Sequence, residues 1–214
     1  MPRIMLLGAP GSGKGTQAAR FASDYDVPVI ATGDILRKNI KENTPLGRKA
    51  QGYIEKGDLV PDDLVIAFVD SAFDEADARG GWLLDGFPRT TAQAEALDAL
   101  LGKTGKKLDR VFLINVPKDE LISRITGRLL CPVCGKIYHE KSMPPRKAGV
   151  CDLDDAVLIR RVDDNAETAK SRIAVYDEQT KPLIEYYAAK GILTEIDGTI
   201  GLEKIEEVIR ETLG

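Results

Sequence analysis

The feature that most constrains this chain is a glycine-rich turn between an apolar run and a helical run. Ile4 to Leu7 are apolar, Gly8 to Thr16 read GAPGSGKGT, and Gln17 to Tyr25 have the spacing of an amphipathic helix. Glycines permit positive φ, so the backbone N–H groups can point inward, and the helix N-terminus adds partial positive charge. Lys14 adds a full charge. The stretch therefore predicts a loop (P-loop) that binds the phosphates of a nucleotide.

One position departs from the usual form of this loop. Gly15 stands where Ser or Thr normally follows the lysine, and the hydroxyl comes one position later, at Thr16. The pattern therefore leaves open whether Thr16 binds magnesium directly. A glycine-rich turn without a ligand is the alternative, but it would require neither the lysine nor the strand-to-helix context.

The composition favours one domain and a small-molecule ligand. The chain has 214 residues, of which 43% are hydrophobic, enough for one α/β domain with a modest insertion. A net charge of -4 argues against a surface for nucleic acid. No segment approaches the ~20 apolar residues of a membrane span, and no signal-peptide pattern precedes the first strand. We therefore expect a cytoplasmic protein with no membrane or nucleic-acid partner.

Short apolar runs rich in β-formers alternate with helical patterns, which predicts a five-stranded, doubly wound parallel sheet. The runs are Ile4 to Leu7, Pro28 to Ala31, Trp82 to Leu84, Val111 to Val116, and Ile192 to Ile196. Ligands of such sheets bind at the carboxyl ends of the strands. The loop at 8–16, the TGD at 32–34 and the DGFPR at 85–89 all follow predicted strands.

Two stretches interrupt this alternation. Between Thr32 and Val60 there are two helical patterns, separated at Thr44-Pro45 and closed by Lys56-Gly57-Asp58, and Pro61 begins another helix. From about 127 to 164 the helical pattern is absent, and Pro, Gly and Cys are frequent. Because this second stretch has no long apolar face, we expect a small inserted lid that requires a cross-link.

Three cysteines and one aspartate could supply that cross-link. Cys131 and Cys134 are separated by two residues, and Cys151 and Asp154 repeat the spacing after sixteen intervening residues. Such a set predicts a tetrahedral zinc site, because a carboxylate oxygen can replace a fourth nitrogen or sulfur ligand. With all four positions occupied by the protein, this Zn²⁺ would be structural.

Other interpretations of the cysteines stay open at this point. Cys131 and Cys134 could be a redox pair, or the thiols could be free in a lid without metal. His139, the one histidine of the chain, could supply the fourth ligand instead of Asp154. Its spacing does not repeat the cysteine pattern, so we expect it to be an ordinary polar residue of the lid.

Taken together, these motifs resemble the adenylate kinases, specifically the long bacterial form with a metal-binding lid, over essentially the whole chain. The resemblance implies a core P-loop domain at 1–31, 61–126 and 165–214, a helical segment that binds the nucleoside monophosphate at 32–60, and a lid with zinc at 127–164. It rests on GAPGSGKGT at 8–16, TGDILR at 32–37, LVPD at 59–62, LLDGFPRTTAQAEAL at 83–97, the arginines around 124–128, the cysteine spacings, and RRVDDNAET at 160–168.

The resemblance also implies residues for each substrate. On the AMP side, where Gln93 would contact the adenine edge, these are Thr32, Arg37, Asp58, Leu59, Val60, Gly86, Phe87, Pro88, Arg89, Gln93, Arg161 and Arg172. On the ATP side they are Gly11, Ser12, Gly13, Lys14, Gly15, Thr16, Arg128, Ile137, Tyr138 and the backbone of Ile200. Arg124, Arg161 and Arg172 would converge on the transferring phosphoryl group, beside the catalytic Lys14, Arg89 and Asp85.

The chemistry of these residue types agrees with phosphoryl transfer. The reaction spreads negative charge over the phosphoryl oxygens, and arginine binds them with two N–H groups without losing its proton. The nucleophile would be the AMP phosphate, which is already anionic, so no general base is required. Asp85 follows an apolar strand and could be a turn cap; we favour a role in holding Mg²⁺, which accompanies ATP, through water.

The expected activity is therefore the reversible conversion of MgATP and AMP to two ADP, by a monomer. A related kinase with another acceptor, or with GTP as donor, is the nearest alternative. A binding module that only senses nucleotides would require the loop but no second basic pocket from Arg37, Arg89, Arg124, Arg161 and Arg172. A GTPase is disfavoured because Ile196-Asp197-Gly198-Thr199 stands where a guanine-binding NKxD segment would follow a late strand.

Overall fold

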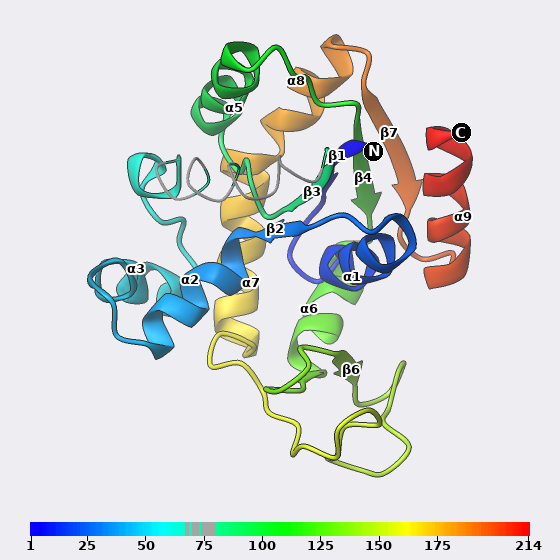
Figure 1. The fold of residues 1–214 in the computed structure, drawn as a ribbon. Helices are drawn as coiled ribbons and strands as arrows, with labels where there is room; N and C mark the ends of the chain where they lie inside the picture. The colour runs from blue at the N-terminus through cyan, green and yellow to red at the C-terminus, as the bar shows by residue number, and fades with distance from the viewer. Residues whose placement is uncertain (67–68, 70–72, 74–79) are drawn as a thin grey trace.

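A five-stranded parallel sheet forms the centre of the molecule (Figure 1). The structure, a computed structural model, describes residues 1–66, 69, 73 and 80–214. The strands lie in the order β2-β3-β1-β4-β7. They are β1 (Arg3–Leu7), β2 (Val29–Ala31), β3 (Trp82–Asp85), β4 (Arg110–Asn115) and β7 (Leu193–Asp197). The doubly wound sheet is confirmed, and each predicted strand differs from the observed one by no more than one residue at either end.

Helices cover both faces of the sheet. The helices and the π-helical turn of the core are α1 (Lys14–Tyr25), α5 (Thr91–Lys103), α6 (Lys118–Thr126), α7 (Ala166–Val175), η1 (Tyr176–Thr180), α8 (Pro182–Ala189) and α9 (Leu202–Leu213). The central strand β1 contributes side chains to the core on both faces of the sheet, because successive side chains of a strand point in opposite directions. Ile4 and Leu6 pack in the cluster with α1 and α9, whereas Met5 and Leu7 pack in the cluster with α5 and α8.

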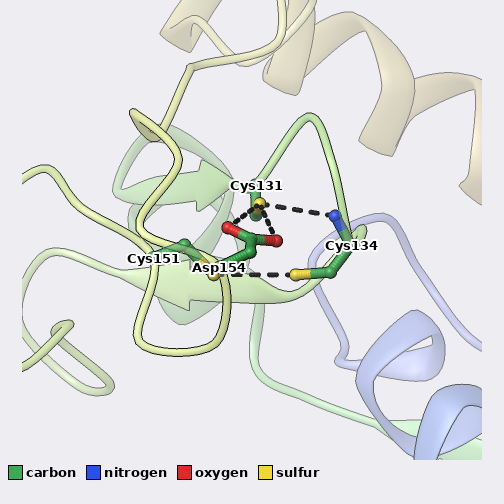
Figure 2. Close-up of side chains that lie close together, drawn as sticks. All are labelled: Cys131, Cys134, Cys151 and Asp154. Atoms are coloured by element: carbon green, nitrogen blue, oxygen red, sulfur yellow. Dashed lines mark hydrogen bonds between the residues drawn. The ribbon is translucent and has the colours of Figure 1, made fainter.

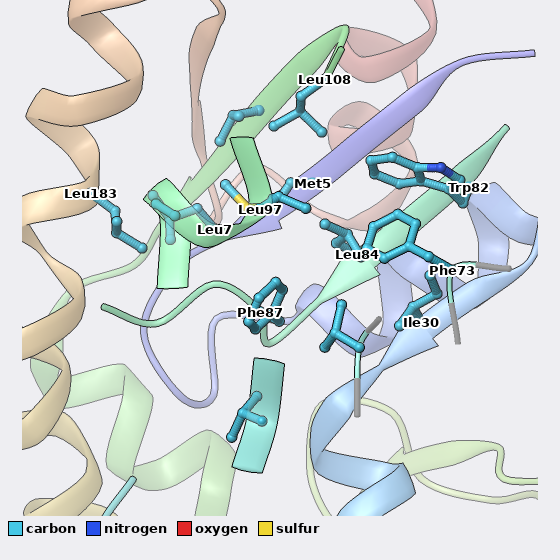
Figure 3. Close-up of a cluster of buried hydrophobic side chains, with 14 of the residues drawn as sticks. Met5, Leu7, Ile30, Phe73, Trp82, Leu84, Phe87, Leu97, Leu108 and Leu183 are labelled. Atoms are coloured by element: carbon cyan, nitrogen blue, oxygen red, sulfur yellow. The ribbon is translucent and has the colours of Figure 1, made fainter. Parts of the chain in front are cut away.

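The larger of these two clusters is an aromatic and aliphatic core (Figure 3). Trp82 and Leu84 of β3 are fully buried there, and Trp82 meets Phe73 edge to face with ring centroids 4.8 Å apart. Phe87, which follows β3, is also only 2% exposed. The core thus extends up to the turn that ends β3, and it fixes the carboxyl edge of the sheet where the predicted site lies.

The two helices predicted between 32 and 60 are confirmed as α2 (Thr32–Lys41) and α3 (Pro45–Lys56). The hydroxyl of Thr44 accepts from the Gly47 N–H, which caps α3, and Pro45 occupies its first turn. The helix ends at Gly57, whose φ of 81° favours glycine. The helix predicted from Pro61 is present over residues 62–66, and its continuation includes positions outside the described residues.

The stretch from 127 to 164 contains no helix, as expected, and is built on a two-stranded antiparallel sheet. Its strands are β5 (Arg128–Leu130) and β6 (Ile137–His139). It has its own small apolar cluster, which includes Cys131, Tyr138, Cys151 and Leu158. None of the helices in the described parts of the chain has the length and apolarity needed to cross a membrane.

Candidate active site

The glycine-rich loop connects β1 to α1 at the carboxyl edge of the sheet. Gly11 has a φ of 85°, and a Cβ added there would lie 2.8 Å from the Leu121 carbonyl oxygen of α6. Gly13 has a φ of 98° and immediately precedes α1. Glycine at these positions therefore lets the loop turn tightly beside α6 and lead into the helix N-terminus, where anions bind.

Lys14 extends back along this loop. Its Nζ donates to the carbonyl oxygens of Gly8 at 2.7 Å and Ala9 at 3.0 Å, and to the Ser12 hydroxyl at 3.4 Å. Burial lowers the pKa of Lys14 to about 8, although Asp85 attracts the ammonium and opposes the shift. The arginines nearby lower the pKa further. An anion in the loop would relieve this repulsion and favour the ammonium form.

Asp85 ends β3 directly beside the loop, because β3 pairs with β1 and Asp85 is opposite Leu6. A Cβ on Gly15 would lie 3.5 Å from its Oδ2 atom. Burial raises the pKa of Asp85, while the charge of Lys14 acts in the opposite direction. A carboxylate oxygen at this distance from the loop is the type of donor that Mg²⁺ uses, so the residues fit a magnesium ion bound through water.

The turn after Asp85 is held by side chains from three segments. The Gly86 carbonyl accepts from the Thr32 hydroxyl and from Arg89 Nε, each at 2.7 Å. Gln93 is only 1% exposed. Its Oε1 accepts from the Arg89 N–H at 2.8 Å, and its Nε2 donates to Asp62 at 2.6 Å. Asp62, which sequence reasoning missed, therefore fixes the orientation of the Gln93 amide.

A cleft of about 910 Å³ opens above the loop. Among the described residues, eight cationic side chains line it, against the carboxylates of Asp34, Asp85 and Glu120, although the chain as a whole has a net charge of -4. The cations are Lys14, Arg37, Arg89, Arg124, Arg128, Lys141, Arg161 and Arg172. The local excess of positive charge favours a polyanionic ligand of small size.

A smaller pocket of about 70 Å³ lies beside this cleft, between α2, the end of α3 and the Gly86 turn. Three arginines, Arg37, Arg89 and Arg172, line both the cleft and the pocket. They therefore lie at the boundary between two sites. Cations shared by two sites are suited to stabilise charge that passes from one ligand to the other.

Carboxylates that the sequence analysis did not assign pair with these arginines. Arg161 and Arg37 both donate to Asp34 Oδ1, at 2.8 and 2.7 Å. Arg172 donates to Asp163 at 3.0 Å, and Arg128 donates to Asp164 at 2.7 Å through Nε. Asp163 and Asp164 are buried. The adjacent aspartates in RRVDDNAET were the available signal, but only the fold shows which arginines they meet.

Even with these partners, the arginine cluster is electrostatically costly. Burial lowers the pKa of Arg161 and of Arg172 to about 10, and neighbouring arginines add to the shift. The Nε of Arg161 is buried without a hydrogen-bond partner among the described residues. The arrangement therefore resembles a preformed anion site, in which unsatisfied donors and repelling charges become paired when a phosphate binds.

Most predicted site residues lie at the cleft or the pocket. The cleft is lined by Gly11, Ser12, Gly13, Lys14, Gly15, Thr16, Asp85, Pro88, Arg124, Arg128, Ile137, Tyr138 and Arg161. The pocket is lined by Thr32, Arg37, Asp58, Leu59, Val60, Gly86, Arg89, Gln93 and Arg172. Ile200 lies between Thr199 and Gly201, which line the cleft. Phe87 differs, because its side chain packs in the hydrophobic core.

The four predicted metal ligands come together in the lid (Figure 2). The ligand atoms of Cys131, Cys134, Cys151 and Asp154 all lie within 4.8 Å of one another. Cys134 Sγ is 3.6 Å from Cys151 Sγ, and Cys131 Sγ is 3.2 Å from an Asp154 oxygen. Two sulfurs bound tetrahedrally at ~2.3 Å would be about 3.8 Å apart. The donor set and its spacing therefore fit Zn²⁺.

His139 is not part of this cluster. Its Nε2 lies 3.2 Å from the Ser123 carbonyl at the end of α6, and its Nδ1 accepts from the N–H groups of Lys141 and Ser142 at 3.1 Å. Asp154, and not His139, therefore occupies the fourth position beside the sulfurs. His139, at the end of β6, instead contacts α6 through Ser123.

Comparison with known proteins agrees with this geometry. The profile of the family described as "Adenylate kinase" matches residues 6–192. The chain is 50% identical to an adenylate kinase from Clostridium beijerinckii over 99% of this chain and 98% of the relative. It is also 50% identical to one from Lachnospira eligens over 99% and 100%, and 51% identical to one from Finegoldia magna over 95% and 94%.

These relatives span nearly the full length of the chain, and the matched region includes the loop, the Gly86 turn and the lid cysteines. The chain therefore belongs to the adenylate kinase family, the enzymes that transfer a phosphoryl group reversibly between ATP and AMP.

Proposed function

We propose that the cleft above the glycine-rich loop binds MgATP and that the smaller pocket binds AMP, so that one phosphoryl group passes between them to give two ADP. The observation that supports this most strongly is the position of Arg37, Arg89 and Arg172, which line both sites. A nucleotide-sensing module would have no use for a second site joined to the first by cations.

In this proposal the protein catalyses transfer by position and charge. Lys14 and the loop N–H groups hold the donor phosphates, and the shared arginines bind the phosphoryl oxygens as charge moves outward onto them. Asp85 and Thr16 would hold magnesium through water, and the ion would neutralise part of the phosphate charge. The attacking oxygen belongs to the acceptor phosphate and is already anionic, so no side chain has to remove a proton.

The lid and the 32–60 segment would exclude water from the reaction. Asp34 of α2 and Arg161 of the 127–164 segment form an ion pair at 2.8 Å, and both residues line the cleft, which supports a shared role of the two segments in covering it. We propose that Zn²⁺ bound by Cys131, Cys134, Cys151 and Asp154 is structural and takes no part in transfer. We further propose that the protein works as a monomer in the cytoplasm; size-exclusion chromatography with light scattering tests the first of these.

A coupled assay across acceptors tests the proposed reaction. AMP should be the preferred acceptor over UMP, CMP and GMP, and ATP should be compared with GTP as donor. ATP alone should be hydrolysed far more slowly than AMP is phosphorylated, because the site is complete only when both nucleotides are bound. Equal turnover of ATP with and without AMP would indicate an ATPase, and preference for another monophosphate would indicate a related kinase.

A further inference from the structure

Tyr138 has a position in the lid that contact with a nucleotide does not explain. It is only 1% exposed, and its ring packs with Cys131, Cys151 and Leu158. Its hydroxyl oxygen lies 3.4 Å from Cys151 Sγ, one of the four clustered ligand atoms. The hydroxyl of this buried tyrosine therefore points at a sulfur of the candidate zinc site.

The direction of this hydrogen bond follows from its neighbours. The Asp152 N–H donates to the Tyr138 oxygen at 2.8 Å, so the oxygen already acts as an acceptor. A metal-bound cysteine is a thiolate and has no proton to donate. The Tyr138 O–H must then donate to Cys151, in addition to the backbone N–H of Leu153, which approaches the same sulfur at 3.5 Å.

The strand that holds Tyr138 also faces the glycine-rich loop. Successive side chains of β6 point to opposite sides. Ile137 lies on the loop side, where its Cδ1 would be 3.6 Å from a Cβ on Gly15, whereas the side chain of Tyr138 lies on the metal side, against Cys151. One short strand therefore contacts the phosphate-binding loop through one residue and the metal cluster through the next.

We propose that Tyr138 is a positioning residue for the metal site: its hydroxyl orients the Cys151 thiolate and ties the zinc cluster to the strand that closes over the phosphate-binding loop. The inference rests on the proposed zinc site. Partners of this kind fix ligand orientation, and their removal typically lowers metal affinity 10–100-fold.

Replacing zinc by Co²⁺ gives a direct readout, because the sulfur-to-cobalt absorption band reports on the thiolates. Tyr138→Phe keeps the ring and removes one hydrogen bond, so the band should shift to lower energy and metal affinity should fall 10–100-fold. The matched control is Tyr187→Phe, which removes another buried tyrosine hydroxyl, on α8, that has no hydrogen-bond partner among the described residues. The control should leave band and affinity unchanged.

A second measurement should shift the cobalt band in the opposite direction. Uniform incorporation of 3-fluorotyrosine makes the phenol a stronger donor, so the band should move to higher energy in the wild-type chain but not in Tyr138→Phe. Because the shift itself is measured in the wild-type chain, this arm keeps the proposal testable even if Tyr138→Phe folds poorly: an unchanged band in the fluorinated wild type would contradict the proposal. As metal leaves Tyr138→Phe, KM should rise for ATP and not for AMP, because β6 contacts the loop and contributes no residue to the smaller pocket.

The outcomes separate the two proposals. If wild-type protein binds neither Co²⁺ nor Zn²⁺, the metal site itself is wrong. If it binds one ion per chain but Tyr138→Phe has the same band and the same affinity, the metal site stands and the role of Tyr138 is wrong.

Discussion

Exchanging one glycine of α3 for alanine should destabilise the segment that lines the smaller pocket. Gly47 is buried where α3 crosses α2. A Cβ there would lie 2.1 Å from the Asn39 carbonyl oxygen and 2.6 Å from the Ile40 nitrogen. These are backbone atoms and cannot rotate away, so the helices would have to separate by roughly 1 Å or more to restore van der Waals contact.

The expected cost is that of overpacking, about 1–3 kcal/mol in the free energy of unfolding. Function should change selectively. Because α2 contains Thr32 and Arg37, and α3 ends just before Asp58, separation of the helices moves two walls of the smaller pocket. KM should therefore rise for AMP, whereas KM for ATP should change little.

The same helix offers a control of opposite sign. Gly52 is exposed, and a Cβ there would meet no atom within 4 Å. Gly52→Ala should therefore stabilise the protein by ~0.5–1 kcal/mol, the usual gain when alanine replaces glycine within a helix. Urea unfolding and steady-state kinetics of both variants provide the test. If Gly47→Ala is as stable as Gly52→Ala and binds AMP normally, α2 and α3 do not approach each other as closely as described.

Three further predictions concern the site. Arg89→Ala should stay folded and lose ~10³–10⁵ in turnover, because Arg89 lines both the cleft and the smaller pocket; wild-type turnover would remove it from the site. The affinity for ATP, measured by calorimetry, should fall above pH 8 by up to about tenfold per pH unit, because ATP favours protonated Lys14, whose pKa in the empty cleft is about 8; Lys14→Met should lack this step. About one zinc should co-purify per chain. Chelation or Cys134→Ser should lower Tm clearly, whereas activity measured well below Tm should survive in part. Complete loss of activity in a folded, zinc-free protein would instead mean that the ion shapes the site.

Features encoded in contiguous residues could be predicted from the sequence. The glycine-rich loop lies within nine residues, and its role follows from backbone freedom, one lysine and the adjacent helix. The cluster of four possible metal ligands could be predicted for a similar reason, because two short spacings each present two ligand atoms. The parallel sheet followed from the alternation of apolar runs and helical patterns.

Features that depend on the approach of distant segments could not be predicted in this way. Asp34 and Arg161 are 127 positions apart, and they meet only because the fold brings both to the cleft. The resemblance placed Phe87 at the AMP site together with its turn, yet its side chain packs in the core. The dual orientation of Ile137 and Tyr138 was hidden because β6 has only three residues, too few for an alternating pattern to be recognised.

The strand order also has a consequence for how the protein is made. β1 leaves the ribosome before its two neighbours in the sheet, β3 and β4, which follow only at 82–85 and 110–115. Until β4 has emerged, the nascent chain exposes a strand whose two faces and two edges are all destined for burial. Pairing of β1 with both of its neighbours therefore waits until residues 110–115 have been made, and contacts so distant in sequence make folding slow compared with a helical bundle of equal size. During that interval the unpaired edges and apolar faces of β1 are open to aggregation.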